Sequence, residues 1–349
     1  MDEIKIQSID QPNSEIIFFL NSVLPFPYNN STFNWEYNHP HKVFQALRYK
    51  TKIVGVQGLI PIEITQNNHI LLSAKSETSY VDTSIKGKGF FKKLYNNVVN
   101  TGLENNIDFI WGLTSLGKVW DKLGFQTKNN FIVISTLSLR ADKTVFHTIN
   151  HKSIIIKTLK FCKYAFNSYK LRYQLFKSKK KDQQMLSEKI ISDQLFGPND
   201  IIDLHDNFMN SSIKIKMTKT YMDYRLKNNP FLKYEVKYLY DNNKKLQGYS
   251  ILSKKNGIAN LVDVFAESQE IKKLLVNINL RQLLKSGETY RLNVFGNKEN
   301  NYIAETFHIL KQYGATKYDT QLYFVLKNHS IGEIKNWYIN GLWTEGINQ

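Results

Sequence analysis

The feature that most constrains the fold of this chain is an order of hydrophobic patterns that occurs twice. In each half, three runs with apolar residues at alternate positions precede a helix-like run, a short buried run, a second helix-like run and a last strand-like run. Alternation with a period of two is typical of strands that bury one face, and a period near 3.6 is typical of amphipathic helices. The order therefore predicts two copies of one α/β unit, with a mixed sheet in each copy.

The periodicity places these elements along the chain. The first half is expected to contain strands at 4–9, 43–49, 53–63, 70–82, 107–113 and 130–139 and helices at 13–24, 90–103 and 115–123. The second half is expected to contain strands at 188–191, 234–240, 246–253, 258–265, 290–295 and 321–326 and helices at 200–209, 270–284 and 302–313. Asn13 or Ser14 should cap the first helix, because a side-chain oxygen there accepts a hydrogen bond from the first turn.

Two short similarities support the duplication. The segment 34–40 (NWEYNHP) precedes the first set of strands as 223–230 (DYRLKNNP) precedes the second, and 120–125 (WDKLGF) is matched by 310–315 (LKQYGA). We therefore divide the chain into a first α/β domain at 1–139, a connector at 140–184, a second α/β domain at 185–330 and a tail at 331–349. The tail is rich in aromatic residues, so we expect it to dock on the body, over the acceptor cleft.

The connector has two interpretations. Its apolar residues lie at near-helical spacing, and it ends in a run rich in lysine at 177–181. Such a segment can lie on a membrane as a basic amphipathic helix. The interpretation that we favour is a long helix that joins and packs on both domains and ends in a solvated turn.

The charge of the chain limits the partners to consider. Lys and Arg number 47 against 30 Asp and Glu, which gives a net charge of +17. This balance suits a nucleic acid, an anionic membrane surface or a polyphosphate ligand, and an AT-rich genome would also produce such a lysine-rich chain. No RNA-binding, helix-turn-helix or zinc-finger pattern occurs, so we expect no nucleic-acid partner.

The sequence favours a cytoplasmic protein. Its N-terminus does not resemble a signal peptide, no run of 18 apolar residues could span a membrane, and the single Cys cannot form a disulfide framework. We therefore expect no stable membrane insertion. The oligomeric state is not fixed by the sequence.

Metal and thiol chemistry find little support. None of the eight His residues lies at metal-ligand spacing with another His, a Cys or paired acids, so we expect no metal. Cys162 lies in the connector among Lys and Phe residues, and a buried structural role is the expected one.

The most informative motif follows the third strand of the first half. The segment 80–94 (YVDTSIKGKGFFKKL) passes from a strand through a turn with Gly87 and Gly89 into a helix. Glycine lets the backbone turn sharply and approach a ligand, and the free N–H groups of a helix start can hold a pyrophosphate. Lys86 and Lys88 add positive charge. Neither a P-loop nor a dinucleotide fingerprint fits, because the required Gly-Lys-Ser/Thr and third glycine are missing.

On these residues the chain resembles the GNAT superfamily of acyl-CoA-dependent N-acyltransferases. The segment 84–89 (SIKGKG) is similar to the family's acyl-CoA motif, with Ser84 in place of Gln or Arg, and 120–125 resembles its Tyr-x-x-x-Gly-Phe element. Within the superfamily the chain looks most similar to tandem GNAT enzymes that acylate nucleotide-linked amino-deoxysugars for surface polysaccharides. The resemblance implies two tandem GNAT-like domains, acyl-CoA as co-substrate and a nucleotide-linked amino sugar, such as a dTDP-3-amino-3,6-dideoxyhexose, as acceptor.

The resemblance also implies roles for individual residues. The strands that end near Asp82 and Leu113 should separate, and a backbone N–H near Val81 should hold the thioester oxygen. The residues expected to bind the coenzyme are Val81, Lys86, Gly87, Lys88, Gly89, Phe90 and Trp120. Glu77, Asp82 and, less favoured, Tyr80 are candidates for the base that deprotonates the amine. Trp120 stands where many relatives have the Tyr that protonates the leaving thiolate, so Ser115 and Lys118 are the candidate substitutes; a packing role is the alternative for Trp120.

The second half lacks the glycine loop. At the matching place it has 263–268 (DVFAES), with two acids that would repel a pyrophosphate. We therefore expect one acyl-CoA site, in the first half, with the second half contributing walls for the acceptor. Trp35, Tyr80 and Asp263 are candidate acceptor-binding residues, although packing explains the aromatic residues and a helix-capping region explains Asp263 equally simply.

Three functions remain in consideration. The first is an N-acyltransferase for nucleotide-linked amino sugars. The second is a tandem GNAT enzyme that acylates an aminoacyl or peptide acceptor. The third is a non-catalytic basic adaptor that binds a membrane or nucleic acid through residues 164–181.

Overall fold

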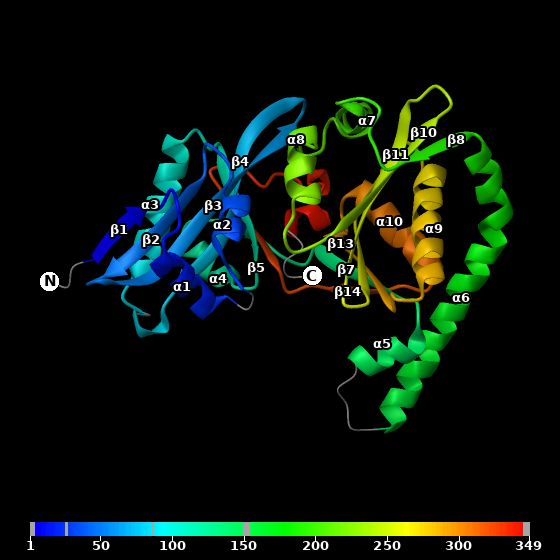
Figure 1. The fold of residues 1–349 in the computed structure, drawn as a ribbon, viewed down its shortest axis with the longest axis horizontal. Helices are drawn as coiled ribbons and strands as arrows, with labels where there is room; N and C mark the ends of the chain where they lie inside the picture. Colours follow the sequence, from blue (N-terminus) through cyan, green and yellow to red (C-terminus); the bar gives the residue numbers. More distant parts are fainter. Residues whose placement is uncertain (1–3, 25–26, 86, 149–153, 345–349) are drawn as a thin grey trace. The chain divides into compact units, whose positions relative to one another are not determined.

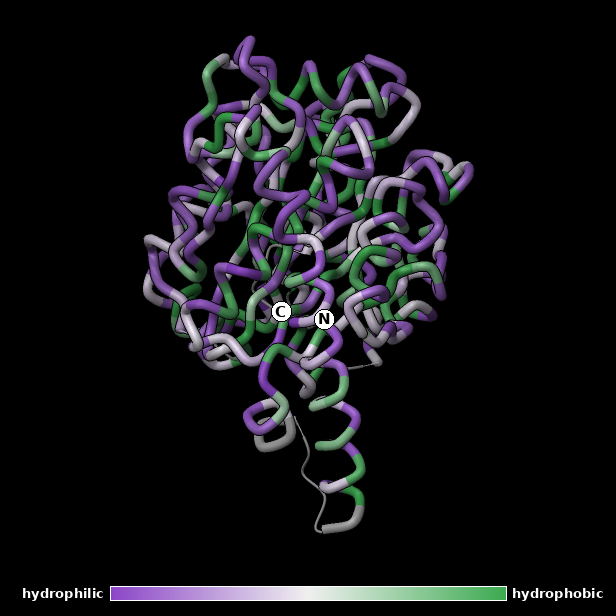
Figure 2. Tube along the Cα trace, turned by 90° about the vertical axis from the view of Figure 1, so that its right-hand side faces the viewer, coloured by the Kyte–Doolittle hydropathy of each residue, from purple (hydrophilic) through white to green (hydrophobic). Residues whose placement is uncertain are grey.

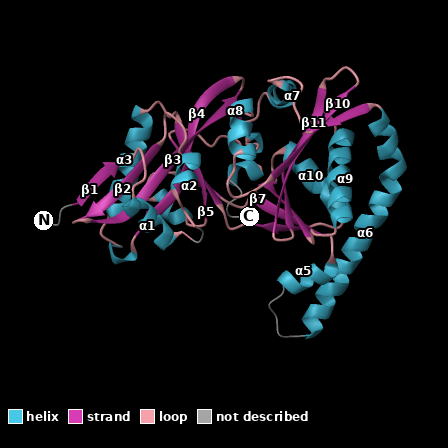
Figure 3. Ribbon diagram, in the orientation of Figure 1, coloured by secondary structure: helices cyan, strands magenta, loops and turns pink. Residues whose placement is uncertain are grey.

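The computed structural model describes residues 4–24, 27–85, 87–148 and 154–344, in two compact units. The first unit comprises residues 1–129 and 321–332, and the second comprises residues 130–320 and 333–349. Each unit contains one mixed β-sheet with helices packed on it (Figure 1; Figure 3). The expected α/β class with mixed sheets is confirmed.

The sheet of the first unit runs in the order β1-β2-β3-β4-β5-β15-β6. Its strands are β1 (Ile4–Ser8), β2 (Val43–Tyr49), β3 (Lys52–Gln66), β4 (His69–Val81), β5 (Phe109–Thr114), β6 (Gln126–Lys128) and β15 (Tyr323–Lys327), and its helices are α1 (Ser14–Val23), α2 (Asn30–Glu36), α3 (Phe90–Glu104) and α4 (Gly117–Asp121). A 3₁₀ turn at Thr83–Ile85 links β4 to the loop before α3.

The sheet of the second unit runs in the order β14-β7-β13-β12-β11-β10-β8. Its strands are β7 (Ile132–Ser138), β8 (Lys189–Ser192), β10 (Tyr234–Asp241), β11 (Leu246–Lys255), β12 (Ile258–Ala266), β13 (Arg291–Asn297) and β14 (Thr316–Asp319). The helices are α5 (Ala141–Thr148), α6 (Ile154–Ser187), α7 (Asp200–Met209), α8 (Lys219–Met222), α9 (Gln269–Ser286) and α10 (Asn301–Gln312); the two-residue strand β9 (Lys214–Ile215) lies between α7 and α8.

The two sheets correspond strand by strand, but each contains one strand from the other half of the sequence. β15 lies between β5 and β6 in the first sheet, and β7 lies between β13 and β14 in the second. The sequence predicted that 130–139 closes the first sheet and 321–326 the second, and this part of the prediction is wrong. Both strands have the same alternating pattern, so periodicity cannot assign them to a sheet. The functional domain limits at 139, 184 and 330 stay predictions.

Local sequence rules explain the helices that cover the first sheet. Asn13 accepts a hydrogen bond from the N–H of Ile16 at 2.9 Å, which confirms it as the cap of α1. Residues Leu94, Tyr95, Val98 and Val99 form the buried stripe of α3, at the spacing expected of an amphipathic helix. α2 was not predicted, because it is short; Asn29 caps it through the N–H of Thr32.

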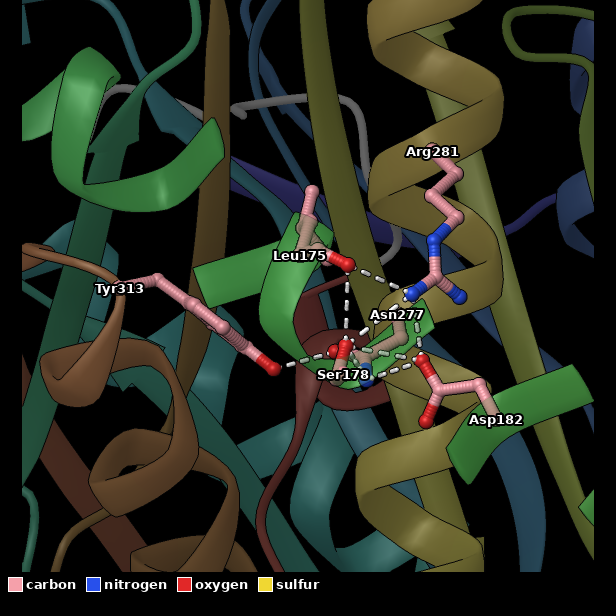
Figure 4. A network of polar contacts seen from close by, with 6 residues as sticks. All are labelled: Leu175, Ser178, Asp182, Asn277, Arg281 and Tyr313. Carbon is pink, nitrogen blue, oxygen red and sulfur yellow. Dashed lines mark hydrogen bonds and ion pairs between the residues drawn. The ribbon is translucent and has the colours of Figure 1, made fainter. Parts of the chain in front are cut away.

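The connector is helical, as predicted, and one face of α6 packs within the second unit. Asp182 is buried; it accepts hydrogen bonds from Asn277 at 2.9 Å and Ser178 at 3.0 Å and forms an ion pair with Arg281 at 2.6 Å (Figure 4). Tyr313 from the end of α10 donates to Asn277. The opposite face of α6 is exposed, and Cys162, expected to be buried, is exposed on it. That the connector also packs on the first domain stays a prediction.

The tail fills a gap in the second sheet. β12 and β13 pair in parallel only over residues 258–260 and 291–293. Beyond these pairs, the N–H of Asn297 donates to the carbonyl of Ile339 at 2.9 Å, and an ideal Cβ on Gly341 would lie 2.8 Å from the carbonyl oxygen of Val262. Trp337 and Trp343 are buried here. The tail therefore packs between two strands of its own unit, and its expected position over an acceptor cleft stays a prediction. Its last residues, 345–349, lie outside the described residues.

Replacement of Gly341 by Ala should destabilise the protein. Its Cβ would meet backbone atoms of Val262 that cannot move aside, so we expect a loss of about 1–3 kcal/mol. Thermal unfolding measures the effect. Gly112→Ala is the control, because its Cβ would make contacts no shorter than 3.4 Å. Equal midpoints for the two variants would contradict the packing of the tail in this gap.

Candidate functional site

The first sheet opens between β4 and β5. The two strands pair in parallel only over 73–75 and 109–111. Beyond Lys75, β4 keeps its pairing with β3 through Val81, and β5 keeps its pairing with β15 through Thr114. The facing edges of β4 and β5 therefore separate, as the sequence resemblance implied, and leave backbone groups at the edge of the gap.

A bulge marks the place where β4 turns away. The register with β3 shifts between Val56 and Gly58, and Thr78 has a φ of 54°, which is unusual for a β-branched residue. The hydroxyl of Tyr37 donates to Thr78 Oγ1 at 3.0 Å, across Gly58, where any Cβ would collide with the Tyr37 ring. No sequence pattern indicated Thr78 or Gly58; the one signal was the position of Tyr37 in the repeated motif before the first sheet.

The ladder beside the bulge orients the backbone of Val81. The N–H of Asp82 donates to the carbonyl of Val54 at 2.8 Å, so Gly55 and Val81 form a non-hydrogen-bonded pair. In such a pair the N–H groups point away from the partner strand. The N–H of Val81 therefore points to the side of β4 on which β5 diverges. The N–H of Asp82, in contrast, already donates to the carbonyl of Val54.

The glycine loop lies between β4 and α3 and has the conformation that the sequence predicts. Gly87 and Gly89 have φ of 83° and 76°, and nothing lies within 4 Å of where their Cβ atoms would be. Gly89 is the N-cap of α3 and no side chain caps the helix. The first N–H groups of α3 therefore face open space above the glycines. Lys86 lies outside the described residues.

The charged side chains at the end of this loop and in the first turn of α3 are positive. Lys88 is exposed, with its ammonium 5.3 Å from the ring centre of Tyr49, which also packs near Phe90. The first turn of α3 contains Lys92 and Lys93 and no acid. Positive charge at a helix N-terminus opposes the helix dipole, and a bound anion would remove the conflict. Lys327, at the end of β15, is affected by the same positive charge: burial, and then the charge of Lys92, lower the pKa of its ammonium group.

Helix α9 of the second unit, which corresponds to α3, starts with a side-chain cap and an acid in its first turn. Ser268 caps α9 by accepting from the N–H of Ile271 at 3.3 Å, and Glu270 lies in the first turn. A capped helix start with an acid does not attract a phosphate. The gap between β12 and β13 is filled by the tail. These differences favour a single anion site, at α3.

The three candidate catalytic side chains lie in different settings. Glu77, on β4 beside the bulge, forms an ion pair with the buried Lys75 at 2.5 Å. Asp82 accepts a hydrogen bond from the N–H of Ser84 at 2.8 Å, and hydrogen bonds from Ser84 lower the pKa of its carboxyl group. Ser115 is exposed just after the end of β5.

Trp120 is a packing residue in this structure. It is buried, and its ring stands edge-on to those of Tyr95 and Phe125, each with a centroid separation of 4.9 Å. Its indole N–H donates to Thr114 Oγ1 at 3.2 Å. The side chain thus holds α4 against the end of β5.

The candidate acceptor residues are not equally accessible. Trp35 is half-buried and Tyr80 is 39% exposed. Asp263, in contrast, is buried, and its carboxylate accepts hydrogen bonds at 2.6 Å from both Tyr249 and Tyr338. Asp263 therefore ties the tail to β12, which is a structural role that the sequence did not indicate.

The second unit also has a cavity of about 800 Å³ beside the first residues of β10. This volume is within the range of small-molecule sites. Its apolar lining comes mainly from Ile191, Met222, Leu226 and Val236, and its charged lining from Asp193, Asp223, Glu235, Lys227 and Lys237.

The described residues contain neither a metal-binding cluster nor a membrane-spanning helix. Over residues 4–24, 27–85, 87–148 and 154–344, no three or more His, Cys, Asp and Glu side chains are grouped so that they could hold a metal ion. Within the same residues, no helix has the length and apolar character needed to cross a membrane.

Comparisons with known proteins identify the fold. No protein-family model and no curated protein sequence matches the chain. Among solved structures, a probable N-acyltransferase from Enterococcus faecalis V583 is similar with a TM-score of 0.59 and 9% identity, over 93% of this chain and 72% of that one. Saccharomyces cerevisiae N-myristoyltransferase with bound myristoyl-CoA is similar with a TM-score of 0.57 and 11% identity, over 94% and 83%.

A tandem GNAT protein from the clavulanic acid biosynthesis pathway is also similar, with a TM-score of 0.57 and 10% identity, over 93% of this chain and 98% of that one. At these identities the likeness establishes the fold alone. The fold of the chain is similar to that of this tandem GNAT protein, and each of its two units has a mixed sheet.

The buried pair of His205 and Tyr249, which joins the Asp263 network, predicts a pH dependence of stability. Burial, and then the charge of Lys214, lower the pKa of His205 to about 3. The unfolded chain therefore binds a proton below pH ~6.5 that the folded protein does not, and stability falls as the pH decreases from there. At pH ~5 this effect amounts to about 2 kcal/mol.

Urea unfolding near pH 7.5 and pH 5 tests this effect. His205→Gln, which keeps a polar partner for Tyr249, should lose less stability on acidification than the unchanged protein does. The same replacement at His69, which is exposed, is the control. An equal loss in all three proteins would show that His205 already binds its proton in the folded state.

Proposed function

We propose that this chain is an acyl-CoA-dependent N-acyltransferase and that its acceptor is a nucleotide-linked amino sugar. The observation that supports the activity best is the uncapped start of α3, with Gly87 and Gly89 open to solvent, beside the gap between β4 and β5. The similarity to N-acyltransferase structures supports the same activity.

The proposed reaction uses this geometry in two steps. The N–H groups of the loop and of the first turn of α3 bind the coenzyme diphosphate, and the thioester arm extends into the gap. There the N–H of Val81 donates to the thioester oxygen. When the amine attacks the carbonyl carbon, this oxygen becomes an oxyanion, and one well-placed donor is worth ~2.7–4 kcal/mol to its stabilisation. Collapse of the intermediate breaks the carbon–sulfur bond and releases the thiolate.

Proton transfer is assigned to Glu77. It is the candidate acid nearest the bulge, next to Thr78, and its carboxylate pairs with Lys75. Hydrogen bonds from Ser84 lower the pKa of Asp82, which makes Asp82 a weaker base. A thiolate with a pKa near ~8.5 leaves with little help, so the packed Trp120 need not supply a proton. Ser115, exposed at the end of β5, is the candidate to donate a hydrogen bond to the leaving sulfur.

The acceptor class depends on the sequence resemblance and on charge. A net charge of +17 suits a reaction with two polyphosphate substrates. The cavity beside β10 in the second unit is lined by carboxylates and lysines, which can bind an ammonium group and a phosphate respectively, so its chemistry suits such an acceptor. A peptide or aminoacyl acceptor is the second candidate, because it too offers an amino group and the similar structures are named as N-acyltransferases.

Replacement of Gly87 by Glu should abolish coenzyme binding without unfolding the protein. The new carboxylate would occupy the open space of the loop and repel the diphosphate. Calorimetry with CoA measures affinity and stoichiometry; we expect one CoA per chain and a loss of affinity of at least about 100-fold, or ~2.7 kcal/mol.

Gly287 offers a matched control for this experiment. It has a φ of 69° and also has open space at its Cβ position, so Gly287→Glu adds the same charge and a similar backbone strain at the end of α9. Unchanged CoA affinity in Gly87→Glu, or two CoA molecules per chain, would contradict the proposed site.

The acceptor and the base are tested together by thiol release. We expect turnover when acyl-CoA is mixed with nucleotide-linked amino sugars, and a mass-spectrometric screen of several sugars and acyl groups identifies the product. Glu77→Gln should lower kcat by about 10²-fold or more with little change in CoA affinity. Asp82→Asn, which keeps an oxygen for the N–H of Ser84, should retain most activity.

The outcomes separate the parts of the proposal. Thiol release with peptide or aminoacyl acceptors but with no amino sugar would favour the second candidate acceptor. Full activity of Glu77→Gln would exclude Glu77 as the base. Absence of turnover with every acceptor class, despite tight CoA binding, would contradict the activity itself.

A further inference from the structure

The outer face of α6 has an apolar stripe that the proposed reaction does not use. We define the outer stripe as Leu159, Cys162, Phe166, Tyr169, Tyr173 and Phe176, which follow one another at alternating steps of three and four residues. That spacing places side chains along one line of a helix. The hydrophobic and hydrophilic residues of this helix are visible in Figure 2, in the long helix at the bottom of the view.

The outer stripe is exposed to a degree that is unusual for aromatic residues. Phe166, Tyr169 and Phe176 are 67%, 69% and 77% exposed, and Leu159 is 66% exposed. The inner face of the same helix is buried through Leu171, Leu175 and Asp182. The helix is therefore already fixed by its inner face, and the outer stripe adds nothing to the packing of α6 within the second unit.

Basic residues flank the outer stripe on both sides. Lys163, Lys170 and Lys177 lie one position after a stripe residue, and Arg172 and Lys179 lie on the other side. From Ile154 to Lys181 the sequence of α6 has nine Lys and Arg and no Asp or Glu. A surface that binds this face must therefore accept large apolar side chains along its centre and supply negative charge along both margins.

We propose that this face of α6 binds the surface of an anionic lipid membrane. The side chains of the outer stripe would enter the boundary between headgroups and acyl chains, the two tyrosine hydroxyls would stay at headgroup level, and the flanking lysines would contact anionic headgroups. The helix lies in the interface and does not cross the membrane. From Leu159 to Phe176 the stripe extends about 26 Å, long enough for several headgroups.

Other occupants fit the same observations less well. A second copy of α6 would bring basic flanks against basic flanks, and like charges at these positions repel. A nucleic acid would satisfy the lysines through its phosphates, but it would leave Leu159 and the continuous apolar line in water. The membrane surface satisfies the apolar stripe and the charge together.

Vesicle co-sedimentation with the full chain tests this proposal. We expect binding to vesicles of phosphatidylcholine with about 30% phosphatidylglycerol, weaker binding to pure phosphatidylcholine, and loss of binding at salt of about 0.5 M, where charges are screened. The variant Phe166→Ser/Tyr173→Ser/Phe176→Ser should reduce the bound fraction at least about tenfold, since it removes most of the apolar area.

Matched controls separate this face from the rest of the surface. Phe18→Ser/Phe196→Ser changes two other exposed aromatic residues, at 77% and 51% exposure, and should leave binding unchanged. Lys163→Glu/Lys170→Glu/Lys177→Glu should abolish the preference for anionic lipid, whereas the same change at the exposed Lys5, Lys52 and Lys233 alters net charge equally and should not.

Several outcomes would overturn the proposal. These are no binding to either vesicle, equal binding to both lipids, or equal effects of the α6 and control variants. A dimer in sedimentation velocity that the serine variant dissociates, without vesicle binding, would assign the stripe to a second copy. Binding of single-stranded RNA that competes with vesicles and depends equally on the stripe would assign it to nucleic acid. Because CoA affinity is measured separately, failure here does not affect the proposed function.

Discussion

The divergence of β4 from β5 is the constraint on which the rest of the first unit depends. A sheet normally satisfies its backbone groups by continuous pairing. Here the parallel pairing stops after three residues, and the bulge at Thr78, held by Tyr37, turns the strand away. This leaves the N–H of Val81 directed into the gap and places the glycine loop at its end. Packing of Trp120 against Tyr95 and Phe125 holds the surrounding helices in place.

The same strand divergence occurs in the second unit, where it has a different outcome. The chain's own tail occupies the gap between β12 and β13, and Asp263 holds Tyr338 of that tail. The helix that follows is capped by Ser268 and has an acid, Glu270, in its first turn. The duplicated architecture is thus retained while the features that would attract an anion are absent, which agrees with the proposal of one coenzyme site, in the first unit.

Particular residues show how much could be predicted. The cap at Asn13, the three strands before each central helix and the left-handed glycines at 87 and 89 follow from local rules, because each depends only on neighbours in the sequence. The glycine loop could be located because it depends on such a motif, whereas the roles of Glu77 and Val81 stay predictions. The bulge at Thr78 and the contact of Tyr37 with Gly58 could not be predicted, since they join residues far apart in the sequence.

By itself, the sequence determined the class of the fold, its duplication and the location of the loop suited to an anion, because hydrophobic period and glycine conformation are local properties. Only the tertiary structure decided which sheet receives β7 and β15, that Asp263 is buried and that one face of α6 remains exposed. The physical reason is that β7 and β15 have the same alternating hydrophobic pattern, so either strand could pair with the same edge of a sheet. The choice between them, like the choice of which helix face to bury, depends on packing between distant segments.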